Sequence, residues 1–504
     1  MKKNTLYLIL LLLLLLNSAK SQLVTYSDPD KEDAKDLTFE VIGKLNGNIH
    51  IYKSYRDYNY INLYDINMHQ VAKKNLAFMP EKVINVDFLQ YPDFYYLFYQ
   101  YQKKSVVYCM AIKFDNNAEK VGEPILLDTT SLSFSTSNKI YTIINSEDKQ
   151  KLMLVKINRP DEKINQVTTV LLDKQLQLVK KTSMTLQMKE RYATLSEFQI
   201  DNTGDLAFLK AFGSGQSDIV NKLTLVTKPA KEDTLGFTEV NIGGIFLDDI
   251  RLKVDNYNKH YLITSFFAKQ RRGNTDGFFC YLWDKAAQKA ILNTRIEFSD
   301  DFRADAKNEG SLKTALNDYF LRNIVIKKDG GVLLAAESAY TASNGSDLYN
   351  RWDGFGSPYS GFNNYSVYGA GGLYGNPFYR NYNTVTRYFA DNIIVLSIDV
   401  TGKMEWSNII RKAQQDENTD NFISYGILNT GDKVHFLFNL QEKRQSVFSD
   451  QSITPEGQIT RSAIIRGLDK GYDFMPRHGK QTGIRQIIVP CQFRGYICFA
   501  KIDF

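Results

Sequence analysis

The chain has few of the residues that build disulfide-held or metal-held scaffolds. Only four cysteines and five histidines occur among its 504 residues. A chain of this length buries a large core without disulfides, so a cysteine-built framework is not expected. The histidines lack the close spacing of metal ligands, since they lie at His50, His69, His260, His435 and His478. We therefore predict no metal centre and no cofactor.

Motifs for nucleophilic or nucleotide chemistry are absent as well. The sequence contains no Gly-x-Ser-x-Gly elbow, no phosphate-cradling loop and no dinucleotide fingerprint. A large excess of charge is also missing, because the net charge of +6 becomes +3 once three N-terminal lysines are removed. The short basic cluster Lys269–Arg272 is typical of a solvated turn between strands. Nucleic-acid binding is therefore not expected.

Only one long hydrophobic run exists, from Leu6 to Leu16. It follows Lys2 and Lys3 and precedes the small residues Ala19 and Ser21. The run is shorter than the ~20 residues that a membrane-spanning helix needs. These features predict a signal peptide over residues 1–21, and no cysteine follows for lipid attachment. We expect an exported protein, periplasmic or extracellular, with no integral membrane segment after cleavage.

Strand signals dominate the rest of the chain. Aromatic residues make up 13% of the sequence, and short runs rich in Val, Ile, Tyr and Phe are separated by Asn, Asp, Gly and Lys. Clear examples are Tyr95–Tyr101, His260–Ala268 and Val434–Leu440. Helical periodicity is nearly absent, and its best candidate is the stretch Gly310–Tyr319.

Several strands end in the same way, with an apolar run that closes on an aspartate. These ends recur roughly every 50 to 60 residues, or at twice that spacing, at Asp65, Asp115, Asp173, Asp284 and Asp399. The turn Thr227–Pro229 fills the wide gap, and Ile464–Asp469 gives a seventh member. Gly-containing turns before other apolar strands recur at intervals that agree with this repeat, as at Asn202–Asp205 and Asn429–Asp432. A four-stranded unit repeating at this interval is typical of a propeller blade.

The sequence therefore predicts an all-β protein, a single β-propeller domain over residues 22–504 with seven four-stranded blades, or six to eight. The last hairpin, Ile487–Phe504, is left over and could close the ring by pairing with the other end of the chain. The competing architecture is a pair of all-β domains such as sandwiches, in which turns recur without a longer period.

Residues 341–390 form an insertion in the sixth unit. They contain eight tyrosines, eight glycines and only five charged residues. Tyr and Trp provide rigid faces with a polar tip, while Gly and Asn let a loop adapt to a partner. Candidate partner- or glycan-binding residues are Trp352, Tyr359, Tyr368 and Tyr374. The alternative is a loop packed on its own propeller or disordered.

Cys491 and Cys498 flank the turn at Arg494 and Gly495. A tight hairpin would bring them face to face, and an oxidising compartment would favour a disulfide. A two-residue turn places them opposite each other at a hydrogen-bonded position of the ladder. At such a position the Cβ atoms lie further apart than at a non-hydrogen-bonded position. Two buried free thiols are therefore the alternative.

The segment Val395–Ser407 resembles the strand-turn-strand of exported bacterial propeller repeats, in which Asp, Gly and Trp recur around the hairpin. It is also similar to the Asp-box of sialidase-type propellers, but Gly402 and Trp406 are displaced from the positions that the box requires. No arginine triad can be assigned. The resemblance implies a fold and an exported location, and it implies no activity.

The function expected from these features is non-enzymatic. We predict a binding or scaffolding propeller of the cell envelope whose partner is an envelope protein or a glycan. The alternative is a carbohydrate-active hydrolase or lyase with carboxylates at the mouth of the propeller, because paired carboxylates converge only in the fold. A purely structural module, marked by a large apolar surface patch, is a third interpretation.

Overall fold

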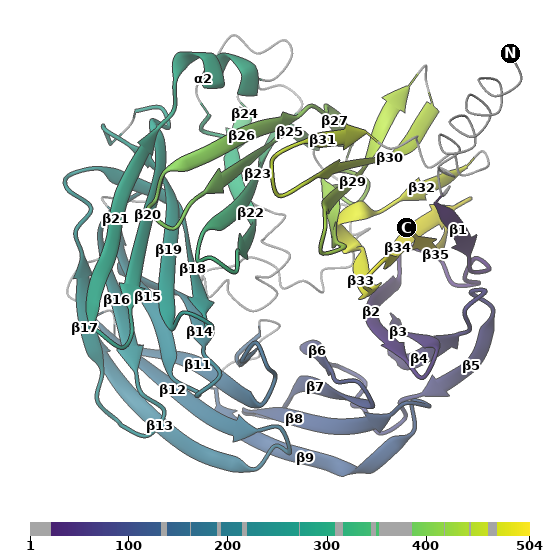
Figure 1. The fold of residues 1–504 in the computed structure, drawn as a ribbon. Helices are drawn as coiled ribbons and strands as arrows, with labels where there is room; N and C mark the ends of the chain where they lie inside the picture. The colour runs from purple at the N-terminus through teal and green to yellow at the C-terminus, as the bar shows by residue number, and fades with distance from the viewer. Residues whose placement is uncertain are drawn as a thin grey trace, which may run out of the picture.

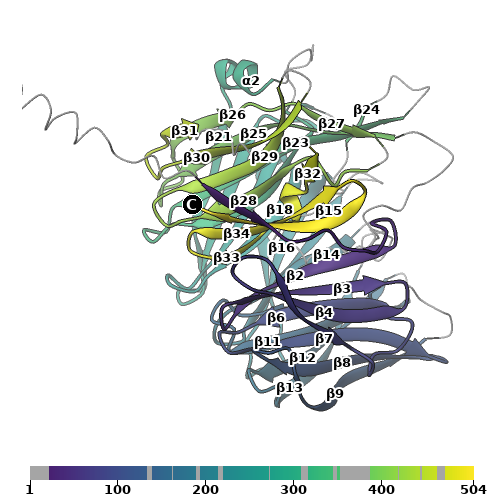
Figure 2. The same cartoon turned by 90° about the vertical axis from the view of Figure 1, so that its right-hand side faces the viewer.

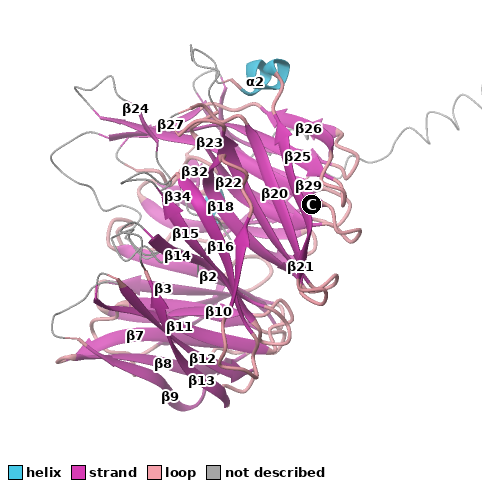
Figure 3. Ribbon diagram, turned by 90° about the vertical axis from the view of Figure 1, so that its left-hand side faces the viewer, coloured by secondary structure: helices cyan, strands magenta, loops and turns pink. Residues whose placement is uncertain are grey.

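The structure is a computed structural model. It describes residues 22–132, 139–161, 163–188, 193–213, 219–271, 273–307, 316–343, 349–351, 386–417, 419–442, 445–461 and 471–504. Strands dominate, and a single short helix stands out among them in Figure 3. The strands follow one another around a ring, from purple through teal to yellow in Figure 1.

The described strands form seven antiparallel sheets, and the eight-stranded one divides into two groups, which gives eight groups of four or more strands. In most groups consecutive strands pair, and the exceptions are in the sixth and eighth groups. The first four groups are β2–β5 (Leu37–Leu45, Asn48–Tyr55, Tyr58–Tyr64, Gln70–Asn75), β6–β9 (Asn85–Gln90, Phe94–Lys103, Val106–Asp115, Lys120–Ser131), β10–β13 (Thr142–Asn145, Lys151–Asp161, Ile164–Asp173, Leu178–Gln187) and β14–β17 (Ala193–Ile200, Leu206–Gly213, Val220–Lys228, Gly236–Val240).

The next three groups continue around the ring. They are β18–β21 (Phe246–Asp255, His260–Ala268, Gly277–Asp284, Lys289–Glu297), β22–β27 (Tyr319–Ile326, Val332–Ser343, Tyr349–Arg351, Thr386–Ile398, Met404–Ile410, Gln414–Glu417) and β28–β31 (Tyr425–Asn429, Val434–Glu442, Gln445–Ile453, Ile459–Arg461). In the sixth group the exceptions are β24 and β27, which pair with β23 and β25. The groups β14–β17 and β18–β21 are joined by a single strand pairing, Val220 with Leu247.

The eighth group joins the two ends of the chain. It contains β32 (Tyr472–Phe474), β33 (Lys480–Gly483), β34 (Gln486–Phe493) and β35 (Tyr496–Asp503), and its outer strand is β1 (Leu23–Tyr26). The exception here is β32, which pairs with β34. Leu23 pairs with Asp503, and Tyr26 pairs with Ala500. Figure 2 shows purple β1 beside the yellow strands. The terminal hairpin therefore closes the ring, as the sequence suggested.

The hydrophobic core consists of eight clusters, each shared by two consecutive groups. The cluster around Leu97 joins the first group to the second, and the cluster around Phe436 joins the sixth group to the seventh. The last cluster packs Ile488 and Phe499 of the eighth group against Val41 and Ile51 of the first. Each group buries both of its faces against neighbours, so the prediction of an all-β propeller is confirmed. The described strands fall into eight groups, one more than the seven that the sequence favoured and within the range of six to eight that it left open.

The recurring aspartates are the caps of the turn before the outer strand. The Oδ1 atom of Asp115 accepts hydrogen bonds from the backbone N–H groups of Asn117, at 2.9 Å, and Glu119, at 2.8 Å. The equivalent bonds occur at Asp65, Asp173 and Asp399. Each carboxylate satisfies two backbone donors in a tight turn, which explains the spacing that the sequence shows.

The seventh expected member of this series, Ile464–Asp469, lies outside the described residues. The corresponding turn of the seventh group comes earlier, between β30 and β31, where Gly457 donates its backbone N–H to the carbonyl of Thr454. The helix is also earlier than the periodicity suggested. It is α2 (Asp300–Ala306), capped by Ser299, whereas Tyr319 already begins β22. Part of the expected helix, residues 310–315, lies outside the described residues.

Candidate functional site

The four aromatic residues proposed from the sequence, Trp352, Tyr359, Tyr368 and Tyr374, lie outside the described residues. The described parts of the insertion are residues 341–343, 349–351 and 386–390. Thr341 pairs with Tyr388 and Ala339 pairs with Ala390, so β23 and β25 continue into residues 341–390 as a paired ribbon.

Buried charged side chains form contacts where β23 and β25 join the ring. Lys412 Nζ lies 2.7 Å from a carboxylate oxygen of Glu337, and both side chains are fully buried. Ser424 donates its hydroxyl to Glu337 over 2.6 Å, and Tyr340 donates to Asp391 over 2.8 Å. Burial lowers the pKa of Lys412, and the nearby carboxylate of Glu337 partly offsets that shift. The cluster fixes the two strands that enter and leave the insertion.

The two paired cysteines lie on β34 and β35. Cys491 pairs directly with Cys498 in the register, and their Sγ atoms are 2.9 Å apart. Both thiols are buried, and burial raises the pKa of Cys491 well above its usual value. The hairpin thus brings the two residues face to face.

The insertion leaves from one particular face of the ring. In the sheet order of each group, counted toward the outer strand, the second strand ends on this face and the third strand begins there, because neighbouring strands are antiparallel and the groups repeat around the ring. We call it the insertion face. Tyr55 at the end of β3 and Ser343 at the end of β23 occupy equivalent places. The turn Arg494–Gly495 between β34 and β35 therefore lies on the insertion face too.

A cavity of about 580 Å³ lies on the insertion face where the last group meets the first. We call it the seam cavity. Its size is within the range of about 300 to 1,000 Å³ that is usual for ligand sites. Four separate segments line it: Lys31, Asp33, Ala34 and Lys35 from the link between β1 and β2, Tyr55 from β3, Thr419 and Phe422 from the link between β27 and β28, and Gln492, Arg494, Gly495 and Tyr496 from the last hairpin.

The link between β1 and β2 is fixed beneath the seam cavity by backbone and ionic contacts. Asp30 donates its backbone N–H to the carbonyl of Ile497 over 2.7 Å, and Asp33 forms an isolated β-bridge with Tyr496. Lys53 Nζ lies 2.7 Å from one carboxylate oxygen of Asp30. The backbone N–H of Lys35 donates to Asp33 Oδ1 over 2.9 Å. The wall of the cavity is therefore built by the contacts that close the ring.

Positive charge exceeds negative charge in the seam cavity. Lys31, Lys35 and Arg494 line it with one acid, Asp33. Within the described part of the chain, none of the three cations forms an ion pair, in contrast to Lys53 and Lys73 nearby. Tyr55, Phe422 and Tyr496 add aromatic faces, and the Tyr496 side chain is 43% exposed. The arrangement suits a ligand with an acidic group and a flat, partly apolar body.

Carboxylates converge on the inner strands β14 and β18. Arg251 contacts Asp249 at 2.7 Å and Glu197 at 3.6 Å, and both acids have positive φ angles, 52° and 57°. Burial raises the pKa of Glu197, and the Arg251 guanidinium partly offsets it. One guanidinium therefore bridges two carboxylates here, which offsets part of their negative charge.

A different acid has no cation among the groups that shift its pKa most. Asp416 on β27 has its pKa raised to about 7, chiefly by burial and further by Asp420 and Asp473. Its Oδ2 atom is buried and has no hydrogen-bond partner in the described parts of the structure. A carboxyl group that titrates near neutral pH is suited to general acid or base chemistry.

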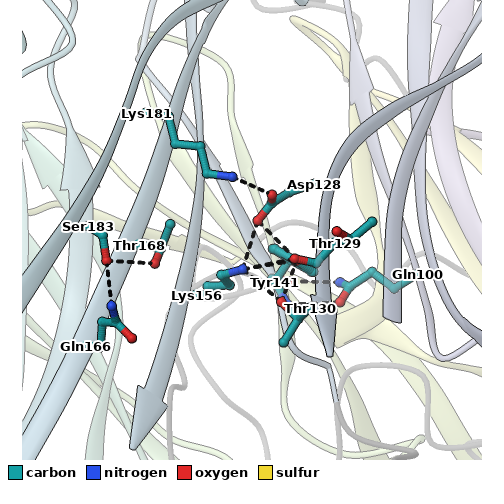
Figure 4. Close-up of polar contacts among 10 residues, drawn as sticks. All are labelled: Gln100, Asp128, Thr129, Thr130, Tyr141, Lys156, Gln166, Thr168, Lys181 and Ser183. Carbon is teal, nitrogen blue, oxygen red and sulfur yellow. Dashed lines mark hydrogen bonds and ion pairs between the residues drawn. The ribbon is translucent and has the colours of Figure 1, made fainter. Parts of the chain in front are cut away.

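The polar network in Figure 4 connects the second group to the third. Lys156 Nζ donates to Asp128, to the hydroxyl of Thr130 and to the carbonyl of Thr129, all within 3.1 Å. Lys181 donates to the other oxygen of Asp128 over 2.7 Å. The ammonium of Lys156 is therefore saturated by protein acceptors, and the network serves to join two sheets.

His435 and Lys269, the first residue of the basic cluster, both lie beside acidic side chains. His435 Nδ1 lies 3.0 Å from Asp450 within a sheet, and no group of three potential metal ligands occurs among the described residues. Lys269 lies between β19 and β20 and pairs with Glu297 at 2.9 Å. In the described ranges, no helix has both the length and the hydropathy needed to cross a membrane.

The seam cavity could not be predicted from the sequence. Its residues come from four places between Lys31 and Tyr496, so no local window contains the site. One signal was available: the strings Tyr55-Arg56-Asp57-Tyr58 and Phe493-Arg494-Gly495-Tyr496 share an aromatic residue, an arginine and a tyrosine at the same spacing.

No family model matches the sequence, and no curated protein matches it. Among solved structures, an ulvan lyase of polysaccharide lyase family PL25 is 8% identical, with 82% of this chain and 90% of that chain covered and a TM-score of 0.37. The polysaccharide lyase Uly1 is 10% identical, with 96% and 99% covered and a TM-score of 0.39. Prolyl oligopeptidase B from Galerina marginata is 7% identical, with 92% and 56% covered and a TM-score of 0.41. Similarity at this level supports no inference about activity.

Proposed function

We propose that this chain is a non-enzymatic binding propeller of the cell envelope, exported by its N-terminal segment, which holds an acidic ligand in the seam cavity. The observation that carries the proposal is the set of three cations, Lys31, Lys35 and Arg494, that line one cavity without ion-pair partners in the described structure. An unpaired cation in a concave site attracts an anion more strongly than one on a flat surface.

The insertion contributes to the same binding face in this proposal. Strand β25 leaves the insertion and pairs with β27, and the chain runs from β27 directly to Thr419 and Phe422 in the cavity wall. Trp352, Tyr359, Tyr368 and Tyr374 are then close in sequence to the strand that leads to the site. We propose them as further contacts for the protein or glycan partner.

Electrophoresis through gels that contain a dissolved polysaccharide tests the proposal. Dextran sulfate and dextran share a backbone and differ in charge, so retardation by dextran sulfate alone reports recognition of the acidic groups. The double variant Lys35→Gln, Arg494→Asn should lose most of the retardation. Asn tolerates the positive φ of Arg494, so the turn is preserved.

The matched control is the double variant Lys259→Asn, Lys289→Gln, which also removes two exposed cations, one from the turn between β18 and β19 and one from the outer strand β21. It should be retarded like the wild type. Equal loss of retardation in the control and in the cavity variant would overturn the proposal, because binding would then follow net charge and not the cavity.

A second function, a carbohydrate-active hydrolase or lyase, is favoured by one observation, the pKa of about 7 at Asp416. In that case the full chain should release new chain ends from polygalacturonate, and Asp416→Asn should abolish the release. Absence of products after prolonged incubation with the wild type would remove this alternative.

A further inference from the structure

The turn Arg494–Gly495, which lines the seam cavity, resembles the turn Arg56–Asp57 in the neighbouring group. Arg494 lies over the ring of Phe493, 5.1 Å from its centroid, and Arg56 lies over the ring of Tyr55 at 5.2 Å. Each arginine occupies the first position of a two-residue turn, and a tyrosine follows the turn. Consecutive groups of the ring therefore present the same cation and aromatic pair on the insertion face.

A third cation continues the series. Lys104 holds the first turn position between β7 and β8 in the next group, where Lys103 pairs with Val106. The φ angles of Arg494, Arg56 and Lys104 are 51°, 54° and 54°. A long side chain is disfavoured in this left-handed region, where Gly, Asn and Asp are the usual residues. Local backbone preference therefore does not explain a cation in three successive turns.

These turns and the seam cavity form one positive surface. The cations of these segments are Lys31, Lys35, Arg494, Arg56, Lys103 and Lys104, and the acids are Asp28, Asp30, Glu32, Asp33, Asp36 and Asp57. Two of these acids are already paired with other lysines, Asp30 with Lys53 and Glu32 with Lys73, so the cations remain in excess. Arg56 has a loose contact with Asp36, at 3.7 Å, and its side chain remains 67% exposed. Two tyrosines stand beside the cations with open rings, since Tyr58 is 75% exposed and Tyr496 is 43% exposed.

We infer that this surface binds a linear acidic polysaccharide that runs from the seam cavity across the turns at Arg56 and Lys104. The inference rests on the proposed function and names its ligand class and the extent of its site. A repeating polymer carries acidic groups and apolar sugar faces along its length, and three consecutive turns each offer a cation, two of them with a tyrosine beside it. An acidic peptide would bind the cations through its carboxylates. It would offer no regularly repeated ring to stack on the two tyrosines.

Chain length provides the test. Heparin-derived oligosaccharides from disaccharide to dodecasaccharide are titrated calorimetrically into the full chain at constant ionic strength. Affinity should rise with length, and the double variant Arg56→Asn, Lys104→Asn should weaken binding of the longest chains by roughly twofold to fivefold per cation. The disaccharide, which fits within the seam cavity, should bind the variant and the wild type equally.

Lys259→Asn is the matched control. Lys259 is exposed, has a φ of 59°, and lies in the turn between β18 and β19 on the opposite face of the ring. It should bind chains of every length like the wild type. A Tyr58→Ala variant should weaken the long oligosaccharides as well, and poly-glutamate of similar length should be insensitive to it.

Three results would overturn the inference. Equal affinity for short and long chains would remove the extended track, and the proposed cavity site would stand if Lys35→Gln, Arg494→Asn still abolished binding. Poly-glutamate bound as tightly as the dodecasaccharide, with the same sensitivity to Tyr58→Ala, would assign the surface to an acidic protein. Equal loss in Lys259→Asn would reduce the effect to net charge.

Discussion

Lys53 and Asp30 form a buried ion pair that joins the N-terminal link to the second strand of the first group. The ammonium lies 2.7 Å from one carboxylate oxygen and 2.7 Å from the hydroxyl of Tyr64, and the lysine side chain is fully buried. Nearby lies the ring of Phe499, from the last group, 5.0 Å from the ammonium. The pair thus sits where the first group, the last group and the N-terminal link meet, under the seam cavity.

Replacing Lys53 with Met should destabilise the protein by about 3 to 5 kcal/mol, because Asp30 would remain buried without its partner. Urea unfolding followed by fluorescence measures the change. The double variant Lys53→Met, Asp30→Asn should recover a large part of the loss, since neither charge is then left alone. A single variant as stable as the wild type would show that the link is not anchored by this pair.

His50 should make the protein sensitive to acid. The side chain is fully buried, its ring lies 5.6 Å from that of Tyr95, and burial lowers the pKa of His50 to about 4. The unfolded chain binds a proton near pH 6.5, so the contribution of neutral His50 to stability is complete above that pH. It is lost as the pH falls from about 6.5 through 4, by roughly 3 kcal/mol.

The pH dependence of the variant His50→Phe isolates this contribution. Free energies of unfolding measured at neutral pH and near pH 4 should fall less for His50→Phe than for the wild type, because other groups titrate alike in both. If both proteins lost the same stability on acidification, His50 would not be the group responsible.

The repeated unit could be predicted from the sequence because its signals are local. The carboxylate of Asp115 caps a turn only four residues long, and the left-handed residue Ala118 completes that turn. The same geometry at Asp173 and Asp399 produces the spacing that identified the fold.

The number of groups and the site depend on contacts between distant parts of the chain. Strand β1 is too short to be recognised from its sequence, and only its pairing with β35 completes the eighth group. The seam cavity likewise requires Lys31, Phe422 and Arg494 to meet through ring closure. Sequence periodicity cannot predict contacts between distant segments, since it depends only on residues that are close together along the chain.

Closure by β1 should depend on Tyr26 and not on Leu23. The ring of Tyr26 stacks on that of Tyr472 with centroids 4.3 Å apart, whereas the side chain of Leu23 is 63% exposed. Tyr26→Ala should cost about 2 to 3 kcal/mol, and Leu23→Ala should change stability by no more than about 0.5 kcal/mol. Thermal unfolding of the two variants gives the comparison, and equal melting temperatures would contradict this role of Tyr26.

Cys491 and Cys498 should form a disulfide when the protein is made in an oxidising compartment. They are direct partners across β34 and β35, which lets the thiols react without a change in register. Alkylation under denaturing conditions followed by mass spectrometry counts the free thiols. Cys109 and Cys280, both buried on other strands, provide the internal control and should be modified in full. Four modified cysteines in protein from such a compartment would contradict the prediction.

Hydrogen–deuterium exchange of the full chain with and without dextran sulfate tests the central claim most directly, because it locates the ligand without any substitution. The account predicts slower exchange in residues 31–36, 419–422 and 492–496, with no change at residues 256–260 on the opposite face. Protection confined to other segments, or spread evenly over both faces, would contradict a binding site at the seam of the ring.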